Sequence, residues 1–157
     1  MIEIEDNDEL KSYIVDGVAK FDGSIICDFD IDVEANIIAC DIHAKNIDAN
    51  DITANVIRAN DVNAYDVCVN AITANNIEVN NMDADTIDAN DIKYYAFCIA
   101  YSSFNCASVV GSRGNSIHKC LDEPIEIVKR VHQVTVQGNK FNLTKEELET
   151  LKKQLKW

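Results

Sequence analysis

The sequence predicts an all-β solenoid, and two observations carry this prediction. Residues 37–101 repeat every five positions through thirteen unbroken units, each with a large apolar residue, a spacer, a second apolar residue and two further, mostly polar residues; the second apolar residue is Ala or Val in all units but the last two, where it is Tyr94 and Ile99. Those last two positions are mostly Asn or Asp, which favour turns because their side chains bond to their own backbone. A fixed period of this kind is typical of a solenoid, in which each unit buries its apolar face against its neighbours.

The period of five excludes the two simple alternatives. In an α-helix five residues advance by about 500°, so successive large residues would be scattered around the helix. In a flat strand an odd period would send every second large residue to the opposite face. The chain therefore turns once per repeat, and each large-x-small triplet forms a short extended side with both apolar residues facing inward. The large positions are Ile37, Ile42, Ile47, Ile52, Ile57, Val62, Val67, Ile72, Ile77, Met82, Ile87, Ile92 and Phe97.

These units resemble the pentapeptide-repeat family, in its bacterial or phage type. The resemblance implies a right-handed, quadrilateral (four-sided) β-helix, with residues twenty apart stacked at the ~4.8 Å spacing of neighbouring strands. It then implies a little over three coils and an outer column of Asn50, Asn70 and Asn90. The chain departs from the family in the order of sizes, because Ile comes first and Ala second. We keep the family's turn phase, since the other phase would bury unpaired Asn or Asp side chains.

The segments around the repeat are suited to cover its ends. We expect residues 1–35 to form a strand-rich cap, because Ile25, Cys27, Phe29, Ile31 and Val33 alternate with acidic residues, as in a strand with one buried face. The β-helix itself should span residues 36–110. Within it, the period shifts by two extra residues near Tyr95. We expect the widened core to be filled by Tyr94, Phe97, Ile99, Tyr101 and Phe104.

Residues 111–130 are predicted to form an irregular connection, because they hold two of the five glycines and the only proline. Residues 131–157 follow as a β-hairpin, Val131–Val136 with Lys140–Leu143, and an amphipathic C-terminal α-helix that begins at a capping box of Thr144 and Glu147. The helix either lies on the hairpin or mediates a homodimer. Its apolar face is the candidate oligomer interface, formed by Leu148, Leu151, Leu155 and Trp157.

Charge and composition narrow the partners and the compartment. The net charge is −13, with −9 in residues 1–35, −7 in residues 36–101 and +3 in residues 102–157. An acidic body does not favour direct nucleic-acid binding, which depends on Lys and Arg at phosphates. The chain has no apolar run of membrane-spanning length and an acidic start, so we expect a cytoplasmic protein with no membrane partner. The six cysteines have no CxxC spacing and are expected to be free thiols.

The cluster of reactive residue types that stands out is Cys98, Cys106, His118 and Cys120. Their spacing matches no usual zinc pattern, and we interpret them as structural or surface residues in preference to a zinc site or a thiol nucleophile. The repeat places the carboxylates at solvated turns, where no burial raises a pKa for acid–base work. We therefore predict no catalytic, cofactor-binding or metal residues, no cofactor and no enzymatic activity.

The leading functional hypothesis is a non-enzymatic structural or protein-interaction module with an unidentified protein partner. The alternative comes from the family resemblance, because some family members are acidic DNA mimics that bind a topoisomerase. Such a mimic would bind that enzyme or another DNA-binding protein. The repeat carries about one net negative charge per ~2 Å of its predicted height, close to the ~1.7 Å of duplex DNA, but its predicted length is short for such a mimic.

Overall fold

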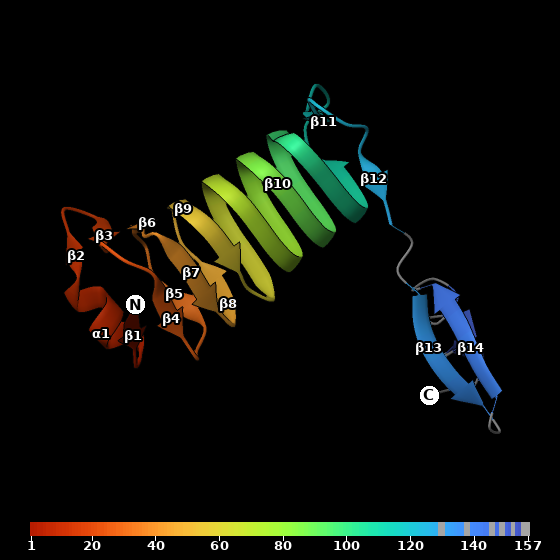
Figure 1. The fold of residues 1–157 in the computed structure, drawn as a ribbon, viewed down its shortest axis with the longest axis horizontal. Helices are drawn as coiled ribbons and strands as arrows, with labels where there is room; N and C mark the ends of the chain where they lie inside the picture. Colours follow the sequence, from red (N-terminus) through yellow and green to blue (C-terminus); the bar gives the residue numbers. More distant parts are fainter. Residues whose placement is uncertain (129–130, 137–138, 145–146, 148–149, 152, 155–157) are drawn as a thin grey trace. The chain divides into compact units, whose positions relative to one another are not determined.

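The computed structural model describes residues 1–128, 131–136, 139–144, 147, 150–151 and 153–154. The chain divides into two compact units, Met1–Glu126 and Ile127–Trp157. The first unit is a β-solenoid of about six stacked coils, drawn from red to cyan in Figure 1. Its coils pair in parallel, so the prediction of an all-β solenoid is confirmed. Among the described residues no helix is long and apolar enough to cross a membrane.

The elements of the first unit are short at its beginning and merge into one long winding strand. They are β1 (Ile2–Ile4), α1 (Asn7–Ser12), β2 (Ile14–Val15), β3 (Val18–Lys20), β4 (Ile25–Cys27), β5 (Ile31–Asp32), β6 (Asn36–Ile38), β7 (Asp41–Ala44), β8 (Asn46–Asp48), β9 (Asp51–Arg58), β10 (Asp61–Gly111), β11 (Ile117–Cys120) and β12 (Glu126–Ile127).

Within the repeat, the register of the strands shows that one coil holds fifteen residues. Ile57 of β9 lies beside Ile42 on one side and Ile72 on the other, and Val62 lies beside Ile47. Three five-residue units therefore complete a coil, and the predicted four-sided coil with residues twenty apart is wrong. The five-residue period fits three sides as well as four, because both keep every large residue inward, and the register of the paired strands decides between them. The right-handed winding stays a prediction.

The predicted inward phase is confirmed from Ile37 to Tyr94, except that Ala44 and Ala59 are only partly buried. The large positions Ile37 to Ile92 are at most 2% exposed, and the small residues that follow them are otherwise buried. The inner columns run at intervals of fifteen, for example Ile37, Ile52 and Val67. Outside, the amides pair in the same register. Asn75 donates to Asn60 at 3.4 Å and accepts from Asn90 at 3.1 Å, so the expected column of Asn50, Asn70 and Asn90 does not form.

The coil widens after Tyr94, and the predicted two extra residues are present. Ser108 donates to Asp91 at 2.7 Å and Ser102 donates to Asp85, both across seventeen residues. Phe104 faces inward as expected, and Cys106 is buried two residues later in the sequence. Phe97, Ile99 and Tyr101 do not, because Cys98 and Ala100 take the buried positions between Tyr94 and Phe104. One extra residue precedes Cys98 and the other precedes Phe104, so the single bulge near Tyr95 is divided between two corners.

The N-terminal segment joins the solenoid as expected, but in several pieces. β4 pairs with β7 and β5 pairs with β8, so the alternating run from Ile25 to Val33 bends round a corner instead of forming one strand. The helix α1 was not predicted. It begins at Asp6, whose carboxylate accepts from the Glu9 amide at 2.8 Å, while the Glu9 carboxylate accepts from the Glu5 amide at 2.7 Å. Its Leu10 is fully buried in the core.

At the other end, the connection 111–130 is less irregular than predicted. β11 lies parallel to β10, with Phe97 beside Ile117 and Ala100 beside Cys120, and so adds a last partial coil. In the second unit the expected hairpin is formed by β13 (Val131–Val136) and β14 (Asn139–Thr144), paired antiparallel with Val136 opposite Asn139. Of the predicted interface, Leu148, Leu155 and Trp157 lie outside the described residues, and Leu151 is helical and half-buried.

Candidate functional site

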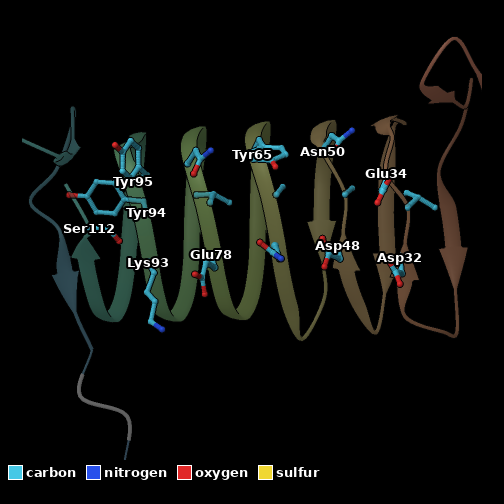
Figure 2. A pocket seen from close by; sticks show the side chains of 16 residues that line it. Asp32, Glu34, Asp48, Asn50, Tyr65, Glu78, Lys93, Tyr94, Tyr95 and Ser112 are labelled. Atoms are coloured by element: carbon cyan, nitrogen blue, oxygen red, sulfur yellow. The ribbon is translucent and has the colours of Figure 1, made fainter.

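A shallow groove of about 510 Å³ runs along one side of the solenoid, across five successive coils. Figure 2 shows its side chains in two rows that follow the solenoid axis. Each coil contributes three consecutive residues and the widened end adds one more. The groove is lined by residues 32–34, 48–50, 63–65, 78–80 and 93–95, and by Ser112.

The repeat itself places these side chains. In each unit the residue between the two inward positions points outward, and in this column the chain carries Asp32, Asp48, Asn63, Glu78 and Lys93. The residue after the small inward position stands at the next corner, where Glu34, Asn50, Tyr65, Asn80 and Tyr95 follow one another. Neighbouring coils lie ~4.8 Å apart, so the groove presents a regular array of side chains on a rigid backbone.

The chemistry of the groove changes along its length. Four carboxylates, Asp32, Glu34, Asp48 and Glu78, line it against a single ammonium, that of Lys93. Two tyrosines rise from the corner row, with Tyr65 61% exposed and Tyr95 50% exposed. The groove is therefore anionic over its first coils, aromatic at Tyr65, and aromatic with a positive charge at Lys93. Such a surface suits recognition of an extended polar chain better than enclosure of a small apolar molecule.

The end of the groove beside Tyr95 is built by packed residues. The Arg113 guanidinium carbon lies 5.5 Å from the centre of the Tyr95 ring, which is a cation–π distance. Tyr94 is only 2% exposed, and its hydroxyl lies 2.7 Å from Nδ1 of His118. The Ser112 amide donates to the Tyr94 carbonyl at 2.8 Å. These contacts fix Tyr94 and Tyr95 against the last partial coil.

The cysteine and histidine residues noted in the sequence do not form a reactive cluster. Burial raises the pKa of the Cys98 thiol to about 12, with Cys106 contributing, and burial with the nearby Asp91 raises the pKa of Cys106 to about 11. Both thiols therefore stay protonated at neutral pH. A cysteine acts as a nucleophile or a metal ligand only as the thiolate. His118 contacts Tyr94, and the Cys120 thiol lies 3.6 Å from the Tyr101 carbonyl.

Over the part of the chain that the structure describes, no group of three His, Cys, Asp or Glu side chains is placed to hold a metal ion. All six cysteines are free. Cys40 and Cys68 are exposed on the outside of the solenoid, whereas Cys27, Cys98 and Cys106 are buried.

Sequence reasoning missed the groove, although a signal for it was present. Tyr65 and Tyr95 replace the usual Asn or Asp at a turn position, and they are thirty residues apart. Thirty is a whole number of fifteen-residue coils and is not a multiple of twenty, so a four-sided coil placed them in different columns. The correct coil length brings both rings to one corner.

Comparisons with protein-family models, curated proteins and solved structures give no significant match. The likeness to the pentapeptide-repeat family therefore stays a prediction from the repeat, and the solenoid fold stands on the structure of the chain.

Proposed function

We propose that this chain is a non-enzymatic interaction module that binds an extended segment of a partner protein along the groove. The observation that carries the proposal is the groove itself, a row of carboxylates beside exposed Tyr65 and Tyr95 on a scaffold that repeats every ~4.8 Å. Exposed tyrosines contribute contact area with little loss of side-chain freedom, which makes them frequent anchors of protein interfaces.

The reactive side chains in the described part of the chain support a role without catalysis. The Cys98 and Cys106 thiols are buried and protonated, and His118 contacts Tyr94. Several carboxylates outside the groove accept hydrogen bonds from neighbouring coils, as Asp61 and Asp66 do from Asn76 and Asn81 at 2.6 and 2.7 Å. These carboxylates therefore contribute to the stability of the stacked coils.

The proposal is tested by selecting a random peptide library on the full-length chain. We expect enrichment of peptides that bind the chain and lose binding to a Tyr65→Ser, Tyr95→Ser variant. A matched Tyr13→Ser, Tyr101→Ser variant removes two tyrosines that are also partly exposed but lie outside the groove. It should retain binding. Selection of no peptide, or equal loss in both variants, would remove the groove as a binding site.

DNA mimicry remains a second candidate, because the solenoid includes the acidic N-terminal segment as well as the repeat. Residues 1–126 hold 24 acidic and seven basic residues, a net −17. About six coils at ~4.8 Å span roughly 29 Å, so the unit carries about one net charge per 1.7 Å, the linear density of duplex DNA. The described carboxylates are all outside the core. If micromolar protein leaves DNA gyrase supercoiling unchanged, the proposal that a topoisomerase is its target is wrong.

A further inference from the structure

We propose that the segment bound by the groove is basic and carries an arginine whose guanidinium stacks on Tyr65. This inference rests on the proposed interaction function and names the chemistry of the partner. Its first support is inside the chain, since Arg113 already holds its guanidinium carbon 5.5 Å from the centre of the Tyr95 ring. A tyrosine at this corner of the solenoid thus accepts a guanidinium over its face.

Tyr65 repeats that corner position two coils earlier, with its ring open. The residue is 61% exposed, and among the described residues no cation covers its ring. Two coil spacings separate the two tyrosines, about 10 Å along the axis. Arg113 is too far along the stack to serve both rings. A cation over Tyr65 must therefore come from a ligand.

The carboxylates in the outward row of the groove, opposite the corner row that holds Tyr65, favour a basic ligand. Asp48 lies in the coil before it and Glu78 in the coil after it, both in the outward row of the groove. Asp32 and Glu34 extend the anionic row toward the N-terminal coils. Carboxylates beside an aromatic face attract a guanidinium by charge and by bidentate hydrogen bonds.

The length and the ends of the groove set the size and direction of the ligand. Five coils span roughly 19 Å, which corresponds to about six residues of extended peptide. Lys93 repels a basic residue at the far end, so the ligand's positive charges lie between Asp32 and Glu78. A neutral oligosaccharide also stacks on tyrosines, but it gives no role to the excess of four carboxylates over one ammonium.

The test titrates full-length protein with the capped hexapeptide Gly-Arg-Gly-Arg-Gly-Gly by calorimetry. We expect binding that weakens at least about threefold when citrulline, which is neutral, replaces both arginines. Tyr65→Ala should weaken binding of the arginine peptide about two- to fivefold, the effect of an exposed cation–π contact. Tyr65→Phe keeps the ring and should bind like the unaltered chain, and Tyr101→Ala serves as the control outside the groove.

The carboxylates are tested with a charge-matched pair of variants. Asp48→Asn, Glu78→Gln should weaken the arginine peptide at least about threefold, whereas Asp22→Asn, Glu123→Gln removes the same charge at exposed sites away from the groove and should have little effect. Raising the salt from 0.05 to 0.3 M should abolish most of the difference, because screening weakens exposed charges.

Three outcomes overturn the inference and separate it from the proposed function. The arginine contact is refuted if the arginine and citrulline peptides bind equally well. It is also refuted if the Tyr65→Ala variant binds the arginine peptide as tightly as the unaltered chain does. If library selection yields groove-dependent peptides without basic residues, the interaction function stands and the basic partner is wrong. If a neutral glucose tetrasaccharide binds in a Tyr65-dependent manner while no peptide does, both proposals fall and the groove is a carbohydrate site.

Discussion

At the scale of single residues, Gly111 is required by close packing. A Cβ atom added there would lie 1.8 Å from the Ser116 hydroxyl and 2.7 Å from the Tyr94 hydroxyl. We expect Gly111→Ala to lower the free energy of unfolding by about 1–3 kcal/mol through overpacking, measured by urea denaturation. Gly114→Ala is the matched control, because a Cβ atom there meets nothing within 4 Å. Equal stability of the two variants would show that Ser116 moves away without cost.

The buried thiols give the stability of the chain an alkaline limit. Burial raises the pKa of Cys98 to about 12 and of Cys106 to about 11, from a usual value of 9.0. The folded state therefore retains protons that the unfolded chain releases above pH 9. The sign of the linkage makes this stabilisation complete below pH 9 and progressively lost as the pH rises toward 11 and 12.

The measurement is urea unfolding at several pH values between 8 and 10.5, on the unaltered chain and on Cys98→Ala, Cys106→Ala. We expect a smaller loss of unfolding free energy with pH in the variant, because two of the groups that titrate differently are gone. Iodoacetamide supplies a second readout: the exposed Cys40 and Cys68 should react in the folded chain, and Cys98 only after unfolding. If the unfolding free energies of both proteins fell equally with pH, Cys98 and Cys106 would not be a source of the pH dependence.

At the scale of elements, α1 covers the first coil and depends on its cap. The Asp6 carboxylate accepts from the Glu9 amide at 2.8 Å, and Leu10 is fully buried. We expect Asp6→Ala to cost about 1 kcal/mol of stability, the usual value of an N-cap. Asp8→Ala removes a neighbouring acid in the first turn that makes no cap bond in the structure, and should cost less. Thermal unfolding followed by circular dichroism distinguishes the two.

The elements also show which features the sequence made predictable. The pattern within a single five-residue repeat predicted the inward Ile, the small residue after it and the two extra residues before Phe104. That pattern did not predict features that depend on how neighbouring repeats pack against one another. Cys98 replaces Phe97 in the core because a corner gains one residue, and single-sequence periodicity does not say which corner. The helix α1 was missed although Asp6 and Glu9 form a readable capping box.

At the scale of the whole molecule, the five-residue period does not determine the number of sides per coil. A period of five is satisfied by three sides or four, because both keep every Ile inward. The register of the paired strands shows three sides, and the period alone does not give that register. A weaker signal existed in the turn positions, where the apolar Val56 and Ala71 interrupt the Asn and Asp residues fifteen positions apart. The candidate groove depends on this choice and was therefore hidden with it.

The division of the chain into two units predicts that the solenoid folds without the second unit. The core of residues 1–126 is filled by side chains of that unit itself. α1 and β1 lie at one end, and Phe104, Cys106 and β11 lie toward the other. A chain that ends at Glu126 should keep the circular dichroism of the β-solenoid and unfold cooperatively, within about 1 kcal/mol of the full chain, because repeat stability is a sum of local and nearest-neighbour contributions. Light scattering with size-exclusion chromatography on both chains measures the oligomeric state. If the full chain is a dimer and the shortened chain a monomer, residues 127–157 hold the dimer together, as the sequence predicts for the apolar face of Leu148, Leu151, Leu155 and Trp157. If the shortened chain aggregates or unfolds without cooperativity, the solenoid does not fold as an independent unit and the prediction is wrong.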